Sequence, residues 1–222
     1  MRSGLFVTVE GPDGSGKTAQ LKALVSKLEG LDLPVLATRE PGGTSISNQI
    51  RGTLLDLKNT AMIDRTEALL YQAARAQLVE ELIKPHLQQG GIVICDRYAD
   101  STLAYQGYGH QNSLSDLRSI INYATGGLTP DRTLLLDLDP EIGLQRRING
   151  GNFNRLDAYD LSFHKRVREG YRQLAQEEPD RWIILDASQS FDVVQKMLWE
   201  TIVEILSQAE YVLPEDIKRG LK

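Results

Sequence analysis

Short apolar runs alternate with longer amphipathic stretches along almost the whole chain. Runs rich in Val, Ile and Leu predict five strands buried on both faces, at residues 4–9, 33–38, 92–95, 133–138 and 182–185. Stretches with helical periodicity occupy residues 17–28, 46–57, 65–88, 113–124, 140–147, 161–176 and 191–207. Because strands that alternate with helices favour right-handed crossovers, the pattern predicts a three-layer α/β fold with a five-stranded, mostly parallel sheet between helices.

In open parallel sheets, ligands bind beyond the carboxyl ends of the strands. The segments that follow the predicted strands are residues 10–18, 39–43, 96–98, 137–140 and 186–188. We therefore expect the functional site to be built from these segments.

The composition is typical of a single globular domain. The chain has 222 residues, of which 41% are hydrophobic and 25% charged, which is enough for a full core. We expect one domain over residues 1–210 and a charged tail over residues 211–222 that lies on the surface.

Charge and hydrophobicity restrict the partners. The net charge of −5 argues against a broad basic face for nucleic acid, so an anionic ligand is expected to be small. No stretch approaches the roughly 20 apolar residues of a membrane span, and the N-terminal apolar run is too short for a signal peptide. The only cysteine, Cys95, lies in an apolar run that favours a buried thiol over a nucleophile or metal ligand. These features predict a cytoplasmic protein with no nucleic-acid or membrane partner.

The first predicted strand runs into the sequence GPDGSGKT, which has the spacing of a phosphate-binding loop. The loop comprises Gly11, Pro12, Asp13, Gly14, Ser15, Gly16, Lys17 and Thr18. In such a loop backbone N–H groups surround phosphates, the lysine reaches the outer phosphates and the threonine hydroxyl ligates Mg²⁺. The context of strand, loop and helix therefore predicts a nucleoside triphosphate with Mg²⁺. Asp13 is unexpected, because it places a carboxylate inside an anion site.

The strand ends also distinguish classes of nucleotide-binding protein. No guanine-reading N-K-x-D follows a late strand, which argues against a GTPase, and the run IVICDR lacks the paired acids typical of motor ATPases. Asp96 can hold Mg²⁺ through water, while the adjacent Arg97 points to a second phosphate. Farther along, Tyr71 and Arg75 share a helical face; Arg75 is either functional or a surface partner of a nearby glutamate.

The segment from residue 148 to residue 154 is rich in Gly and Asn and is flanked by Arg146, Arg147 and Arg155. This composition suits a flexible flap over a site, or an ordinary surface loop with arginines nearby. The residues alone leave both interpretations open.

Five motifs in sequence order resemble those of bacterial thymidylate kinases. They are VEGPDGSGKT, TREPGGT, LLYQAARAQ, CDRYADSTLAYQG and NRLD, and the resemblance extends to about residue 207. It implies the P-loop nucleoside monophosphate kinase fold with a short mobile lid at about residues 146–157. It also implies phosphoryl transfer from ATP to dTMP, giving dTDP for dTTP synthesis, and a homodimer in which the apolar stretch 65–87 could form the interface.

The resemblance assigns roles residue by residue. Arg97 and Arg51 would hold the dTMP phosphate, Tyr71 would stack on thymine, and Arg75 would hydrogen-bond an edge of the base. The remaining acceptor-pocket residues would be Glu40, Pro41, Ser101, Thr102, Gln106 and, against the sugar, Tyr105. Asp13 would turn toward the acceptor and accept a bond from its 3′-hydroxyl; the alternative is a contact with loop backbone N–H groups.

An arginine that neutralises the transferring phosphoryl group comes from the phosphate loop or from the lid in this family. Gly14 follows Asp13, so the resemblance assigns this role to the lid, to Arg146, Arg147 or Arg155. Arg155 matches the family motif most clearly. Two rival functions are a kinase for another monophosphate and a slowly hydrolysing regulatory module.

Overall fold

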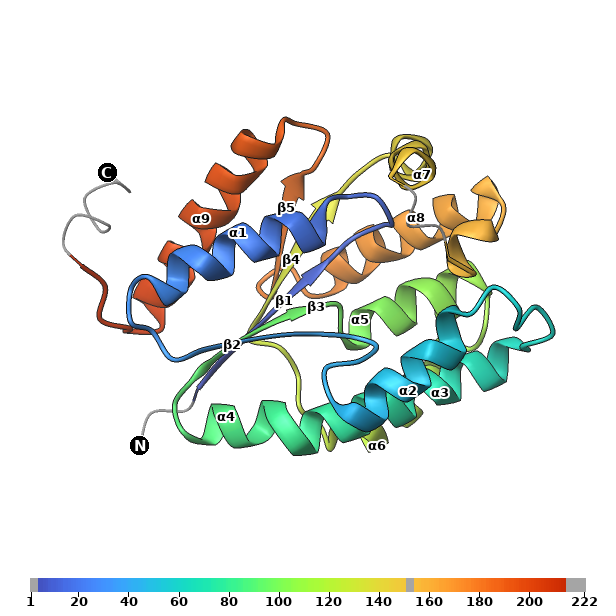
Figure 1. The fold of residues 1–222 in the computed structure, drawn as a ribbon, viewed down its shortest axis with the longest axis horizontal. Coiled ribbons are helices and arrows are strands. Elements are labelled where there is room, and N and C mark those ends of the chain that lie inside the picture. The colour runs from blue at the N-terminus through green and yellow to red at the C-terminus, as the bar shows by residue number, and fades with distance from the viewer. Residues whose placement is uncertain (1–3, 151–153, 215–222) are drawn as a thin grey trace.

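The computed structural model describes residues 4–150 and 154–214. At its centre lies a parallel sheet in the order β2-β3-β1-β4-β5 (Figure 1). The strands are β1 (Leu5–Glu10), β2 (Val35–Arg39), β3 (Ile92–Asp96), β4 (Arg132–Asp137) and β5 (Trp182–Asp186). All four pairings are parallel, which confirms the predicted five-stranded sheet.

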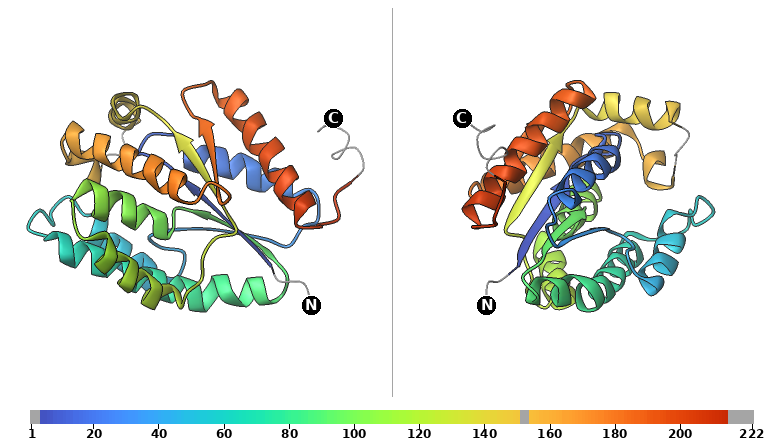
Figure 2. Two further views of the ribbon diagram at one scale, coloured as in Figure 1. Left: turned by 180° about the vertical axis from the view of Figure 1, so that it is seen from behind. Right: turned by 60° about the vertical axis from the view of Figure 1, so that its left-hand side comes forward.

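Helices cover both faces of the sheet (Figures 1 and 2). They are α1 (Lys17–Glu29), α2 (Ser45–Leu55), α3 (Asp64–Leu78), η1 (Val79–Ile83), α4 (Lys84–Gln88), α5 (Ala99–Thr102), η2 (Leu103–Gly109), α6 (Leu114–Thr125), α7 (Pro140–Asn149), η3 (Leu156–Ala158), α8 (Leu161–Glu177) and α9 (Phe191–Gln208). The helix α1 packs with α9 on one face, and the opposite face carries α3, η1, η2, α6 and α8.

Side chains along the central strands point alternately to the two faces of the sheet and so contribute to a core layer on each face. Val7 and Leu134 pack toward α1 and α9, whereas Phe6 and Leu135, one position away, pack toward the other helices. A strand with helices on both sides is buried on both faces, which explains why β1, β3 and β4 are largely apolar. The buried Thr8 of β1 and Thr133 of β4 satisfy their hydroxyls by a mutual hydrogen bond.

The prediction of burial on both faces is wrong for the two edge strands. In β2, Ala37 is exposed, and in β5, Ile184 is 54% exposed. An edge strand has only one neighbour in the sheet, and the flanking helices do not extend fully over it.

Residues 99–109 form a helical segment, α5 followed by η2, that the periodicity did not predict. Its polar residues Asp100, Thr102 and Gln106 are at most 4% exposed, because other side chains bind them. A helix that buries polar residues has no clear apolar stripe, so its sequence carries little helical signal. By contrast, the predicted helix 65–88 is helical throughout. A π-helical turn, η1, interrupts its α-helical geometry just before Pro85, whose nitrogen has no proton to donate to an α-helical ladder, and α4 then continues to Gln88.

The start of the predicted surface tail belongs to the core. Tyr211 and Leu213 are 9% and 3% exposed and pack with α1 and α9. The Tyr211 hydroxyl donates to the carbonyl of Gly90 at 3.0 Å. Residues 215–222 of that tail lie outside the described residues.

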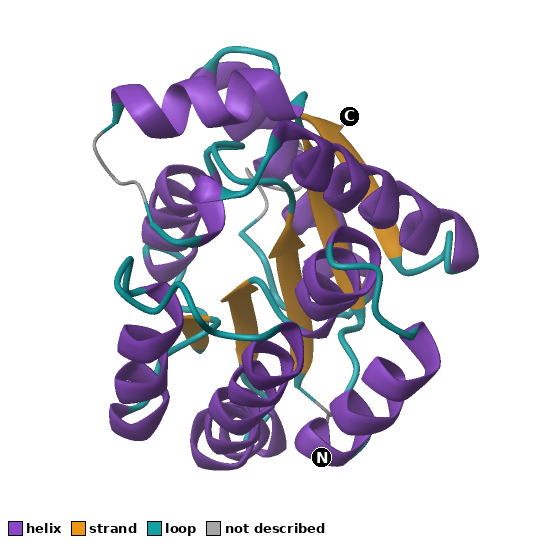
Figure 3. Cartoon of the chain, turned by 90° about the vertical axis from the view of Figure 1, so that its right-hand side faces the viewer, coloured by secondary structure: helices purple, strands orange, loops and turns teal. Residues whose placement is uncertain are grey.

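All five strands run toward the same side of the molecule (Figure 3). Glu10 ends β1, Asp96 ends β3 and Asp137 ends β4, with the phosphate loop following β1. The parallel topology thus gathers charged residues from distant parts of the sequence at one edge.

Candidate active site

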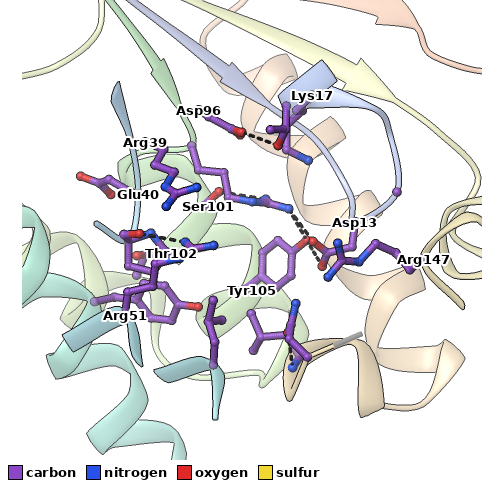
Figure 4. Close-up of a pocket in the computed structure, with 18 of the residues that line it drawn as sticks. Asp13, Lys17, Arg39, Glu40, Arg51, Asp96, Ser101, Thr102, Tyr105 and Arg147 are labelled. Atoms are coloured by element: carbon purple, nitrogen blue, oxygen red, sulfur yellow. Dashed lines mark hydrogen bonds and ion pairs between the residues drawn. The ribbon is translucent and has the colours of Figure 1, made fainter. Parts of the chain in front are cut away.

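The carboxyl ends of the strands open onto a cavity of about 540 Å³. Most predicted site residues line it, namely Asp13, Gly14, Gly16, Lys17, Thr18, Glu40, Pro41, Arg51, Tyr71, Asp96, Arg97, Ser101, Thr102, Tyr105, Gln106, Arg146 and Arg147 (Figure 4). Gly11, Pro12, Ser15, Arg75 and Arg155 do not line it. One cavity therefore joins the phosphate loop to the predicted acceptor residues.

The phosphate loop presents positive charge and backbone donors to this cavity. Gly14 and Gly16 have φ angles of +76° and +87°, a region that favours glycine. Gly16 is the N-cap of α1, so the unpaired N–H groups of the first helical turn are placed at the loop. Lys17 folds back over the loop and donates from Nζ to the carbonyls of Gly11 and Pro12 at 2.9 Å. Burial lowers the pKa of Lys17 to about 8, so it stays charged at neutral pH.

Two candidate metal ligands lie together beside Lys17. The Thr18 hydroxyl donates to Asp96 Oδ2 at 3.0 Å. In residues 4–150 and 154–214, no group of three or more His, Cys, Asp or Glu side chains could hold a metal ion. Mg²⁺ takes one or two protein oxygens and fills its remaining positions with phosphates and water. Thr18 and Asp96 therefore fit Mg²⁺ shared with a bound nucleotide.

Asp13 is held by two side chains that face the acceptor part of the cavity (Figure 4). Arg97 donates from Nη2 to Asp13 Oδ1 at 2.8 Å, and the Tyr105 hydroxyl donates to Asp13 Oδ2 at 2.7 Å. The Arg97 guanidinium also lies over the Tyr105 ring, 4.9 Å from its centroid. Among the described residues, no backbone N–H is bonded to this carboxylate, in contrast to the alternative interpretation of Asp13.

Electrostatics keep Asp13 ionised. Burial alone would raise its pKa, but the positive charges of Arg97 and Lys17 outweigh burial and lower the pKa to about 2. The carboxylate therefore acts only as an acceptor at neutral pH, and it neutralises part of the surrounding positive charge.

Arg97 occupies an unusual backbone position. Its φ angle is +71°, a left-handed conformation that is rare for residues other than glycine. Its backbone N–H donates to Val9 O at 3.0 Å. Nη1 donates to the hydroxyls of Ser101 and Tyr171 at 3.2 and 3.0 Å. Sequence reasoning did not single out Tyr171, because a tyrosine in a long amphipathic helix carries no functional signal.

Arg75 is buried behind the cavity wall rather than paired on the surface. It is 1% exposed, and Nε donates to Glu40 Oε2 at 2.8 Å. Its terminal nitrogens donate to Gln72, Thr102 and the carbonyl of Tyr98. The surface-pair interpretation is therefore wrong, and Arg75 holds Glu40 and Thr102 where they line the cavity.

The helices α2, α3 and η2 form the wall of the cavity that contains the predicted acceptor residues. Arg51 donates from Nη1 to the carbonyl of Pro41 at 2.8 Å, which fixes it beside the turn after β2. Tyr71 from α3 and Gln106 from η2 complete this wall. Gln106 is oriented by its bond from Nε2 to Glu67 at 2.7 Å.

The structure separates the three predicted lid arginines. Arg146 and Arg147, at the end of α7, line the cavity, and Arg147 lies beside Asp13 (Figure 4). Arg147 forms a two-pronged ion pair with Asp157, with Nε 3.0 Å from Oδ1 and Nη2 2.7 Å from Oδ2. Residues 151–153, in the middle of the predicted lid, lie outside the described residues.

Arg155 has a different environment. It is 7% exposed, pairs with Glu67 and donates to the carbonyl of Leu54 at 2.9 Å. A further bond joins it to the hydroxyl of Tyr159 at 2.9 Å. In this arrangement Arg155 anchors the C-terminal end of the predicted lid to α2 and α3.

Comparisons with known proteins agree with this geometry. The thymidylate kinase family model matches residues 9–198, well over half of the chain. The chain belongs to the thymidylate kinase family. A thymidylate kinase from Roseiflexus castenholzii is 51% identical over 207 residues, which cover 87% of this chain and 90% of the relative. One from Deinococcus radiodurans is 48% identical over 204 residues, covering 92% and 98%.

A solved structure shows the same fold. The crystal structure of thymidylate kinase from Ehrlichia chaffeensis superposes with a TM-score of 0.71 at 32% identity, covering 90% of this chain and 99% of that one. The predicted family, fold and enzyme class are thus confirmed, and the chain is a kinase that phosphorylates dTMP. The rival functions, a kinase for another monophosphate and a regulatory module, are not supported by these relatives.

The phosphate loop of this kinase touches the helix that leads into the lid. A Cβ added to Gly143 in α7 would lie 2.2 Å from the carbonyl oxygen of Asp13, and one added to Gly14 would lie 2.1 Å from the carbonyl oxygen of Gly143. Such distances are far below van der Waals contact, so each glycine is required for the approach of the two backbones.

We predict that Gly143→Ala pushes α7 away from the loop and lowers kcat by about 10²-fold, the effect of misplacing catalytic groups by about 1 Å. The measurement is steady-state turnover, with circular dichroism to show that the fold persists. The control is Gly52→Ala in α2, where an added Cβ meets nothing within 4 Å. Wild-type turnover in Gly143→Ala would contradict the prediction.

Proposed function

We propose that the enzyme transfers the γ-phosphoryl group of ATP to dTMP with Mg²⁺ as cofactor. The observation that carries this proposal is the single cavity that joins Lys17, Thr18 and Asp96 to Arg97 and Tyr105. The first three suit the phosphates of a magnesium-bound triphosphate. The last two suit a second, phosphorylated ligand.

The acceptor is proposed to lie between the segments after β2 and β3. Arg97 and Arg51 would bind its phosphate, because guanidinium groups match phosphate geometry. Tyr71 would stack on thymine, and Tyr105 would pack against the sugar. The Asp13 carboxylate would accept a bond from the 3′-hydroxyl, which agrees with its orientation toward Tyr105 and Arg97.

The base edge is assigned to Arg75 with Ser101, Thr102 and Gln106, while Glu40 and Pro41 complete the pocket. Arg75 already donates to Gln72, Thr102, Glu40 and the Tyr98 carbonyl. It reaches the base only by sharing one of these donors, so its role is both to contact the base and to fix Thr102.

Transfer requires little proton chemistry. The attacking group is an oxygen of the dTMP phosphate, which is ionised at neutral pH, so a strong general base is not needed. Bound Mg²⁺ would neutralise charge on the donor phosphates. The side chains contribute alignment of the two phosphates and positive charge around them, mainly from Lys17, Arg97 and a lid arginine.

The substrate assignment is tested by coupled ADP release with dTMP, dUMP, dCMP and dGMP. We expect dTMP to give the highest kcat/KM and omission of Mg²⁺ to abolish release. Comparable rates with dCMP would remove the thymine-pocket assignment. ATP hydrolysis that does not depend on any monophosphate would contradict the proposal as a whole.

Among the lid arginines, we propose that Arg147 is the one that contacts the transferring phosphoryl group. It lines the cavity beside Asp13, and its bonds are to the lid residue Asp157. Arg146 is the nearest alternative, while Arg155, the best match to the family motif, is buried against Glu67.

We expect Arg147→Ala to lower kcat by about 10³-fold or more, as for other arginines that stabilise the phosphoryl group during transfer. Arg155→Ala should mainly lower the melting temperature, because it leaves the buried Glu67 without its arginine partner. The matched control is Arg118→Ala, since Arg118 pairs on the surface with Glu177. Full turnover in Arg147→Ala, with the loss in Arg146→Ala or Arg155→Ala instead, would move the role to that arginine.

No helix in the described part of the chain is long and apolar enough to cross a membrane. Because its substrates are nucleotides, we propose that the enzyme acts in the cytoplasm. We further propose a homodimer formed through α3 with its neighbours α2 and α6. Leu69 in α3, Ile46 in α2 and Tyr123 in α6 are 51%, 51% and 91% exposed.

We predict that Leu69→Glu converts the dimer to a monomer, because it places a charge in an apolar interface. Light scattering coupled to gel filtration measures the mass. Ile184→Glu is the control, since Ile184 is 54% exposed on β5, away from these helices. A monomeric wild-type protein would refute the proposed dimer.

A further inference from the structure

Glu10, the last residue of β1, is a buried carboxylate for which the mechanism above has no use. It is 0% exposed and accepts three hydrogen bonds. The donors are the Tyr98 N–H at 2.7 Å, the Ser101 hydroxyl at 2.6 Å and the Tyr171 hydroxyl at 2.8 Å. Burying a charge is costly unless it is bonded, so this arrangement is specific.

The two hydroxyls that bind Glu10 are the same two that bind Arg97. Arg97 Nη1 donates to Ser101 Oγ at 3.2 Å and to the Tyr171 hydroxyl at 3.0 Å. An ionised carboxylate has no proton and can only accept. Each hydroxyl therefore points its proton toward Glu10, and the lone pairs of its oxygen face the Arg97 guanidinium. The two hydroxyl oxygens lie 2.8 Å apart. Each hydroxyl has one proton, so a donation between them would replace a donation to Glu10.

We propose that Glu10 is a positioning residue for phosphate binding: through Ser101 and Tyr171 it fixes the Arg97 guanidinium against the acceptor phosphate. The inference rests on the proposed role of Arg97. On its other side, Arg97 is held by Asp13 and Tyr105, so the guanidinium is clamped between two carboxylates with hydroxyls on both sides.

The hydrogen bonds that link Glu10 to Arg97 through the Ser101 and Tyr171 hydroxyls form a relay. Protonation of Glu10 would reverse the direction of one of these bonds. A protonated carboxyl donates from one oxygen, so one hydroxyl must then accept from Glu10. That hydroxyl has one lone pair fewer for Arg97, which weakens its bond to the guanidinium. The titratable groups around Glu10 are Arg97, Asp100, Lys17, Arg75, Cys95 and Tyr171. Burial, with the nearby Asp100, raises the pKa of Glu10 to about 7 although Arg97 opposes the shift. Phosphate binding should therefore weaken as pH falls through about 7.

The decisive experiment compares two ligands that differ only in the phosphate, dTMP and thymidine, by calorimetry on the full chain. In Glu10→Gln, an amide that accepts from the Tyr98 N–H must point its NH₂ at the two hydroxyls, which then accept from residue 10 and have fewer lone pairs for Arg97. We expect the Kd for dTMP to rise about 10- to 100-fold, the loss of a charge-assisted bond. The Kd for ATP should stay within about twofold, and the Kd for thymidine should rise much less than that for dTMP.

Tyr171→Phe removes one of the two hydroxyls that link Glu10 to Arg97 and leaves Glu10 in place. It therefore tests the role of Glu10 even if Glu10→Gln fails to fold. We expect a smaller loss that is again confined to dTMP. Tyr98→Phe is the matched control, because the Tyr98 hydroxyl donates to Leu128 O at 3.2 Å, outside the relay. It should leave the ratio of dTMP to thymidine affinity unchanged.

The pH dependence gives an independent readout. Wild type should lose dTMP affinity through about pH 7 in addition to the titration of the phosphate itself, whereas Glu10→Gln should show only the phosphate titration. Equal losses of dTMP and thymidine binding in Glu10→Gln and Tyr171→Phe, or no loss in either, would overturn the inference.

Arg97→Ala separates this inference from the proposed function. If Arg97→Ala leaves the ratio of dTMP to thymidine affinity unchanged, the assignment of Arg97 to the phosphate is wrong. If that ratio collapses in Arg97→Ala but not in the Glu10 and Tyr171 variants, only the role of Glu10 is wrong.

Discussion

The ion pair between Arg97 and Asp13 joins the two segments on which the site depends. Asp13 follows β1 and Arg97 follows β3, and these strands are neighbours in the sheet, so their carboxyl ends meet. The pair brings a cation and an anion into one cavity without leaving either unpaired, which buried charges require. The unexpected acid in the phosphate loop thus lies beside the arginine that we propose binds the second substrate.

Behind the lining residues lies a second set of buried bonds that fixes their orientation. Arg75 holds Glu40 and Thr102, and Glu67 holds Gln106 and Arg155. A cavity that binds two charged substrates gains from such bonds, because side chains that are already oriented lose less entropy on binding and reorganise less during transfer. The cost is a set of buried polar groups on α3, α5 and η2, which explains why the periodicity did not predict α5 and η2.

The predicted lid has contacts at both of its ends. At its start, Gly143 lets α7, the helix that carries Arg146 and Arg147, approach the phosphate loop. At its C-terminal end, Arg155 pairs with Glu67 in α3, the helix that carries Tyr71. The phosphate loop and α3 are therefore both connected to the segment between them.

The sequence by itself determined the parallel sheet, the phosphate loop and the family, because these rest on local periodicity, on spacing within one loop and on motifs in order. It also named most residues that line the cavity. The phosphate loop and the strand ends follow from the parallel topology, and the remaining acceptor-pocket residues came from the family resemblance. It could not show that Arg75 and Arg155 are buried among polar partners, that residues 99–109 are helical, or that Glu10 and Tyr171 support Arg97. Those features depend on contacts between residues up to 161 positions apart, and only the tertiary structure brings such residues together and decides which charges are paired and which face the cavity.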